Sequence, residues 1–348
     1  MRVVLVGLGA VGVRAARQLI SVDDVEVLTV VHRKPERVAT LVEALGAHDK
    51  VRVVEGNAAH PGSELDGHDV AVLAFDAPMR PAAAAAVERG LHVVATGDEP
   101  TRVHSLLSLD AEARQRGVVV AAGVCLAPGI SCVLAAHGAA SLDMVEEVHV
   151  ASVGTGGPQC ARRHHSAMSS IAVDWRDGAW SRHPAGSGRE LVWFPEPVGG
   201  ADCYRGALVD PWLLVPAFPG VRRVTARLGA TRRDRMTAWM PMLRPPHPEG
   251  TVGAVRAEVR GWSGGLPAER ILGAAARPAL GAGTVAAQTA SWAVAGRLRR
   301  AGAGGLAELV GAPGVFLAEL GTRGVHTEIF EGSTTARDAV SDVTGGAA

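Results

Sequence analysis

The chain has 348 residues, enough for two domains that each bury a core. Its 35 basic residues balance its 35 acidic ones, so no nucleic acid or other acidic polymer is expected as a partner. No apolar run reaches the about 20 residues of a membrane span, which argues against a membrane partner. The chain opens on a strand without a basic leader, and we expect a cytoplasmic protein.

The cysteines show no CxxC pair and no metal-ligand spacing, so we expect no metal site and read them as free thiols of a reducing compartment. They are Cys125, Cys132, Cys160 and Cys203.

An apolar run at residues 3–6 leads into three glycines with GxGxxG spacing. The first glycine allows a tight turn, the second lets backbone N–H groups approach phosphates, and the third lets the next helix pack closely. A plain glycine turn is the alternative, but the strand before the motif and the amphipathic stretch after it favour a dinucleotide site. The residues expected at the pyrophosphate are Gly7, Gly9, Ala10, Val11 and Gly12.

The second predicted strand, residues 25–31, ends in His32, Arg33 and Lys34. An NAD-selective site usually places a carboxylate here to bind the ribose 2′-OH, whereas a guanidinium suits a 2′-phosphate. These three residues therefore predict NADP as the cofactor. A solvated basic loop is the alternative interpretation.

The first third of the chain alternates strands with helices. Beyond the opening unit we predict strands at 51–54, 69–75, 91–95 and 118–122 and helices at 35–45, 81–89 and 101–115. Strands separated by helices predict an α/β fold of Rossmann type, a doubly wound parallel sheet with right-handed crossovers.

The pattern changes after about residue 125. We predict a helix at 130–139, strands at 145–153, 190–194, 222–228 and 252–262, a Gly-Gly hairpin into 269–276, and a helix at 284–299. Residues 181–189 read as a loop. This half predicts an α+β domain on a mostly antiparallel sheet. The expected organisation is a dinucleotide-binding domain at 1–125, a substrate and dimerisation domain at 126–305, helices returning to the first domain at 306–330, and a flexible tail at 331–348.

Three segments resemble the saccharopine dehydrogenase-like family of NAD(P)-dependent oxidoreductases, which includes the lysine 6-dehydrogenases. They are the glycine motif at 7–12, the stretch from Asp69 through the Pro78 turn to Glu99, and residues 121–130, which contain the Pro-Gly crossing between domains. The resemblance implies hydride transfer at a C–N bond of an amino-acid-like molecule, and a homodimer.

In a doubly wound sheet, ligands lie beyond the carboxyl ends of the strands. The loop after the fourth strand is therefore expected beside the nicotinamide ribose, and Gly97-Asp98-Glu99 and the 125–129 loop should face the same crevice. Asp76 and Glu99 are candidates for handling a proton or holding an ammonium group; a helix cap for Asp76, and a salt bridge or helix-start charge for Glu99, are the alternatives. The loop residues expected at the cofactor are Phe75, Asp76, Ala77 and Pro78, and those expected at the substrate are Cys125, Pro128 and Gly129.

The second half offers His164, His165, Tyr204 and Arg205 as further candidates. Adjacent histidines on a helix point about 100° apart, so a shared metal is not expected, but one of them can exchange a proton near neutral pH. We take His165 and Tyr204 as candidate catalytic groups, and His164 and Arg205 as candidate substrate contacts. A surface His/Arg patch and a core tyrosine are the alternatives.

These features predict an NADP-preferring oxidoreductase that reduces an imine or oxidises an amine. Two other functions stay open. One is an NADPH-dependent ketone or aldehyde reductase, and the other is a sensor that binds NADP without turnover.

Overall fold

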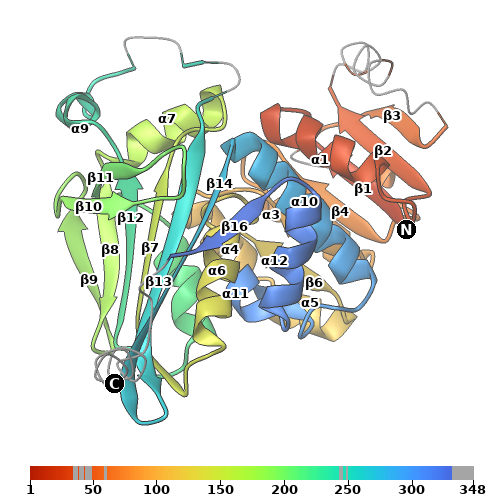
Figure 1. The fold of residues 1–348 in the computed structure, drawn as a ribbon. Helices are drawn as coiled ribbons and strands as arrows, with labels where there is room; N and C mark the ends of the chain where they lie inside the picture. Colours follow the sequence, from red (N-terminus) through yellow and green to blue (C-terminus); the bar gives the residue numbers. More distant parts are fainter. Residues whose placement is uncertain are drawn as a thin grey trace.

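The structure, a computed structural model, describes residues 1–33, 38, 43, 49–58, 61–242, 246–247 and 250–330. Most of the helix expected at 35–45, together with Lys34 and the expected tail at 331–348, lies outside the described residues. Within the described part, the strands form two sheets, and α6, α10, α11 and α12 lie between them (Figure 1).

The first sheet has seven described strands, all parallel, in the order β15-β6-β5-β4-β1-β2-β3. Strands β4 and β6 are apolar along their whole length and fully buried, as expected for a parallel sheet covered on both faces. The predicted Rossmann sheet is confirmed. The strands are β1 (Arg2–Val6), β2 (Val27–His32), β3 (Val51–Glu55), β4 (Val70–Leu73), β5 (His92–Ala95), β6 (Val119–Ala122) and β15 (Gly302–Gly304).

Helices cover both faces of this sheet. On one face lie α1 (Ala10–Ile20) and α10 (Pro278–Val294), packed against each other. On the other lie α3 (Arg80–Glu88), α4 (Pro100–Leu107) and α5 (Asp110–Arg116); a short 3₁₀ turn, η1 (Ser63–Leu65), precedes β4. The sequence predicted one helix at 101–115, but the structure has two. Asp110 begins the second, where its carboxylate accepts a 2.9 Å hydrogen bond from the backbone N–H of Ala303 in β15.

The second sheet has the order β10-β11-β12-β7-β13-β14-β16, with β8 paired to β12 and β9. Only the β7–β12 pair is parallel among the described pairs, so the predicted, mostly antiparallel sheet is confirmed. The strands are β7 (Met144–Val153), β8 (Ile171–Arg176), β9 (Ala179–Pro184), β10 (Glu190–Trp193), β11 (Gly200–Tyr204), β12 (Arg223–Gly229), β13 (Gly253–Ser263), β14 (Leu266–Ala276) and β16 (His326–Ile329).

The helices of the second half connect the two sheets. Helix α6 (Ile130–Ala139) packs on β7, β13 and β14, and α11 (Leu306–Leu309) and α12 (Pro313–Thr322) pack on α6. The chain returns to the first sheet at α10 and β15, earlier than the expected return at residue 306. The remaining elements are α7 (Pro158–Ala167), α8 (Asp210–Leu214), η2 (Val215–Ala217) and α9 (Arg232–Thr237).

Of the helices in the described part of the chain, none combines the length and the apolar character that a membrane crossing needs.

Candidate functional site

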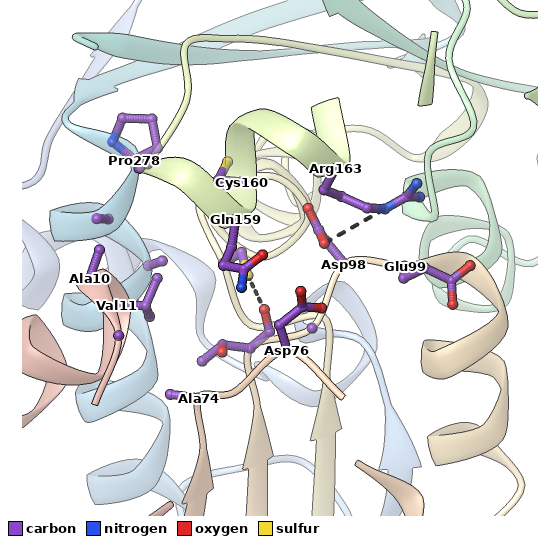
Figure 2. Close-up of a pocket in the computed structure, with 18 of the residues that line it drawn as sticks. Ala10, Val11, Ala74, Asp76, Asp98, Glu99, Gln159, Cys160, Arg163 and Pro278 are labelled. Carbon is purple, nitrogen blue, oxygen red and sulfur yellow. Dashed lines mark hydrogen bonds and ion pairs between the residues drawn. The ribbon is translucent and has the colours of Figure 1, made fainter. Parts of the chain in front are cut away.

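A cavity of about 890 Å³ lies between the carboxyl ends of the first sheet and helix α7. Its lining comes from the loops after β1, β2, β4, β5 and β6 and, on the opposite side, from the end of β7, from α7 and from the start of α8. Figure 2 shows Asp76 and Asp98 rising from the strand ends toward Gln159, Cys160 and Arg163 on α7. This is where ligands bind in open parallel sheets.

The glycine turn forms one end of the cavity. Gly7 has φ +98°, and a Cβ on it would lie 2.5 Å from the carbonyl oxygen of Ala74. A Cβ on Gly9 would meet nothing within 4 Å, so this position faces open space. Gly9 is also the N-cap of α1 and provides no capping side chain, while Ala10 and Val11 line the cavity. The open space beside an uncapped helix N-terminus suits a pyrophosphate.

The basic end of β2 lies along the same cavity. His32 is half-buried, Arg33 is exposed, and both are among the lining residues. The third basic residue of this run, Lys34, is outside the described residues. A cationic edge thus borders the end of the cavity next to the glycine turn.

The loop after β4 contributes Phe75 and Asp76 to the lining; Ala77 and Pro78 are not among the described lining residues. The Oδ1 atom of Asp76 lies 2.5 Å from Nη1 of Arg102 on α4, and both side chains are partly exposed. Asp76 therefore enters the site as half of an ion pair.

Glu99 lines the cavity and caps α4. Its carboxylate accepts hydrogen bonds from the backbone N–H of Thr101 at 3.1 Å and of Arg102 at 2.9 Å. Partial burial acts against ionisation, but these two donors hold the pKa of Glu99 below its usual range. The helix-start charge, the alternative expectation for Glu99, is present in the structure.

Asp98 faces Arg163 across the cavity. The distance from its Oδ1 to Nε of Arg163 is 3.9 Å, which is longer than a hydrogen bond. Burial raises the pKa of Asp98, and the guanidinium of Arg163 only partly offsets this. Nη2 of Arg163 donates to the carbonyl oxygen of Ala207 at 2.8 Å, and its buried Nε has no hydrogen-bond partner within the described structure.

Asp210 is a second buried carboxyl group in the lining, and its side chain accepts a 2.9 Å hydrogen bond from the hydroxyl of Ser131. Only 3% of Asp210 is exposed. Burial raises its pKa to about 6, against the opposing effect of the Ser131 hydrogen bond.

The loop that starts with Cys125 closes tightly on itself. The backbone N–H of Cys125 donates to the carbonyl oxygen of Pro128. Cys125 and Pro128 both line the cavity, whereas Gly129, the N-cap of α6, is not among the described lining residues.

Burial raises the pKa of the Cys125 thiol well above its usual value and that of Cys160 to about 11. Both thiols are therefore neutral and poor nucleophiles.

Of the two adjacent histidines, His164 lines the cavity, and burial lowers its pKa. His165 points elsewhere, because its Nε2 lies 2.7 Å from the carbonyl oxygen of Met240. The structure thus brings one of the two candidates to the site.

Tyr204 and Arg205 do not reach the cavity lining. Tyr204 is 3% exposed and lies in an apolar cluster with Met168 and Leu228. Nε of Arg205 donates to the carboxylate of Asp174 at 2.9 Å, within the second sheet. A core tyrosine and a structural ion pair describe these two residues, so their placement does not support the predicted contacts with a substrate.

The charged lining residues that the sequence did not single out include Arg163 and Asp210. Asp98 was expected at this crevice, at the end of the fifth strand, but no chemical role was predicted for it. Arg163 and Asp210 come from α7 and α8, whose positions over the first sheet depend on how the two halves pack. No signal in the sequence marks that packing.

No group of three or more His, Cys, Asp and Glu side chains that could hold a metal ion occurs in the described ranges.

No family model matches the chain. Among solved structures, the fold is similar to apo saccharopine dehydrogenase (L-Glu forming) from Saccharomyces cerevisiae, with a TM-score of 0.65 and 13% identity over 94% of this chain and 99% of that one. It is also similar to amine dehydrogenase from Mycobacterium smegmatis, with a TM-score of 0.51 and 14% identity over 89% of this chain and 96% of that one. The chain therefore has a saccharopine dehydrogenase-like fold, which confirms the resemblance at the level of architecture.

Proposed function

We propose that this protein is an NADP-preferring oxidoreductase that acts on a C–N bond of an amino-acid-like small molecule, reducing an imine or oxidising an amine. The observation that carries this proposal is the continuity of the cavity. One space of about 890 Å³ joins the glycine turn to the charged groups Asp76, Asp98 and Arg163. A dinucleotide and a small charged substrate can therefore meet in it.

The residues of the cavity fit a nicotinamide dinucleotide. The turn at Gly7 and Gly9 and the first residues of α1 would hold the pyrophosphate, and the loop at Phe75 and Asp76 would lie along the nicotinamide ribose. When bound, the nicotinamide supplies or accepts a hydride. The preference for NADP rests on Arg33, whose guanidinium suits a 2′-phosphate.

The charged groups opposite the glycine turn favour a substrate that carries both a nitrogen and a carboxylate. Arg163 offers a guanidinium whose buried Nε has no hydrogen-bond partner among the described residues, and the carboxyl groups of Asp98 and Asp210 line the same cavity. Such groups would orient the substrate beside the nicotinamide. The names of the two similar enzymes, a saccharopine dehydrogenase and an amine dehydrogenase, support a C–N bond as the target.

The proposal is tested by mixing the protein with NADPH and a panel of cyclic imines, pyrroline and piperideine and their carboxylates, and following the loss of nicotinamide absorbance. Ketones and aldehydes of matched size form the comparison panel. Consumption with the imines supports the proposal. Activity with ketones alone would identify a C–O reductase, and tight NADPH binding with no turnover of either panel would identify a sensor.

A further inference from the structure

Four carboxyl groups line the cavity within the described residues, and three of them are engaged by close partners. Asp76 forms a 2.5 Å ion pair with Arg102, and Glu99 accepts two backbone hydrogen bonds as the cap of α4. Asp210 is almost completely buried and held by Ser131. Asp98 is the fourth.

Asp98 differs from the other three in its partners. Its side chain keeps 38% of its surface accessible and belongs to the cavity wall. Its cationic neighbour, Arg163, lies at 3.9 Å and approaches from α7 on the other side of the cleft (Figure 2). A ligand that enters between the strand ends and α7 therefore meets a carboxyl group that no strong bond holds.

We propose that Asp98 is a catalytic residue that exchanges a proton with the substrate nitrogen, and that Arg163 is its positioning residue. This inference rests on the proposed function. In the direction of reduction, a bound reduced nicotinamide would supply a hydride, with its electron pair, to the imine carbon. The nitrogen takes the proton of the Asp98 carboxyl group, so the product amine gains both hydrogens and Asp98 becomes a carboxylate. Amine oxidation runs the same transfers in reverse.

The surroundings of Asp98 suit both of its protonation states. Burial and the negative charges of Asp76 and Glu99 raise its pKa, so a larger share of the carboxyl group stays protonated near neutral pH. Arg163 acts in the opposite direction and stabilises the carboxylate that remains after the proton leaves. Asp210 faces the same region, and the thiols of Cys125 and Cys160 stay neutral there because their own pKa values are raised.

The first arm of the test compares the wild type with Asp98→Asn, Asp98→Glu and the matched control Asp66→Asn. Asp66 is an exposed carboxylate that pairs with Arg89. With pyrroline and piperideine as probes, we expect Asp98→Asn to lower kcat by about 100-fold or more, because a positioned general acid contributes at least that factor. Asp98→Glu should restore part of the rate. NADPH binding, followed by its fluorescence, should change less than about twofold in all three variants. A twofold change in Kd corresponds to less than about 0.5 kcal/mol of binding free energy.

The second arm needs no substrate. In the protein without nucleotide, the ¹³C-labelled carboxyl signal that disappears in Asp98→Asn should titrate above the value of an ordinary aspartate. Arg163→Gln should move that titration to still higher pH, and should extend the pH range of imine reduction in the same direction. A merely structural role of Arg163 would leave both pH dependences in place.

The outcomes separate the two proposals. If the wild type binds NADPH but turns over neither imine, the proposed reaction is wrong. If the wild type is active and Asp98→Asn keeps its kcat within about twofold, far less than a lost general acid would cost, Asp98 is not the proton-transferring group. An Asp98 carboxyl signal that titrates like that of an exposed aspartate would overturn the inference even without turnover data.

Discussion

A Cβ on Gly12 would lie 2.2 Å from the carbonyl oxygen of Gly7, so the first turn and helix α1 approach each other to a distance that only glycine permits. A Cβ on Gly9, between them in the sequence, would meet nothing within 4 Å. The three glycines of one motif thus have different physical roles. Gly7 and Gly12 allow close backbone packing, and Gly9 leaves the space beside it open.

Substitution by alanine separates these roles. Gly12→Ala should lower the free energy of unfolding by about 1–3 kcal/mol, the usual cost of overpacking. Gly9→Ala should cost less than about 1 kcal/mol, as for a change of N-cap residue. It should nevertheless weaken NADPH binding about tenfold or more, or 1.4 kcal/mol, because the new methyl group fills the space for the pyrophosphate. Urea unfolding and NADPH titration of both variants are the measurements. Unchanged affinity in Gly9→Ala would place the pyrophosphate elsewhere.

From the cationic end of β2 we predict that the protein distinguishes NADPH from NADH through Arg33. Arg33→Ala should weaken NADPH binding by about 1.5–3 kcal/mol, the range for a hydrogen bond to a charged group, and leave NADH binding nearly unchanged. Calorimetry with both nucleotides measures the difference. An equal loss for NADPH and NADH would show that Arg33 does not recognise the 2′-phosphate.

The cap at Glu99 predicts a pH-dependent stability. Removing its side chain in Glu99→Ala should lower the free energy of unfolding by about 0.5–2 kcal/mol at neutral pH, as for other N-cap deletions. Because the folded pKa of Glu99 lies below its unfolded value, this contribution is present above the unfolded pKa and is lost as the pH falls through the folded pKa. The stability curves of wild type and variant should therefore converge in acid. A gap that persists there would mean that the carboxylate is not the cap.

For the buried carboxyl group of Asp210, we predict that the free energy of unfolding changes with pH in the opposite direction. Its folded pKa of about 6 exceeds the ordinary value of 3.8, so the charged carboxylate destabilises the fold once the pH rises through that interval. Asp210→Asn keeps an acceptor for Ser131 and removes the charge. It should raise the free energy of unfolding at about pH 8 by up to about 3 kcal/mol and give no gain at about pH 4. Thermal unfolding at the two pH values is the measurement, and a variant that is less stable at both would contradict the assignment.

The first sheet was predictable because its signals are local. Each of its apolar strands is followed by a turn or helix signal that depends on neighbouring residues, and the glycine motif carries its own geometry. Strand β15 is the exception, since Gly302–Gly304 has no strand pattern; it pairs with β6, and the carboxylate of Asp110 accepts a hydrogen bond from the backbone N–H of Ala303.

The second sheet was less predictable because charged residues interrupt the alternation of its strands. Strand β9 was expected to be a loop over much of its length, and β8 was not predicted. Asp174 of β8 is buried although it is charged, which is stable only because Arg205, at the end of β11, and Arg227, in β12, pair with it. Those partners are distant in the sequence, so no local pattern reveals the strand.

The two sides of the candidate site also differ in how well the sequence predicts them. The cofactor half follows from the glycine motif and the strand ends, whereas the opposite wall depends on where α7 and α8 lie. Asp98 and Arg163 are far apart in the sequence and meet only because the two halves of the chain pack together. Tyr204 and Arg205 were attractive from sequence because they are adjacent and chemically versatile, but both are used within the second sheet.

The central claim is that the cavity beside the glycine turn binds a nicotinamide dinucleotide and prefers the one with a 2′-phosphate. Calorimetric titration of the wild-type protein with NADPH and with NADH tests it most directly. We predict saturable one-to-one binding of NADPH, at least about tenfold (1.4 kcal/mol) tighter than that of NADH. Saturating titrations in which neither nucleotide binds would contradict the claim.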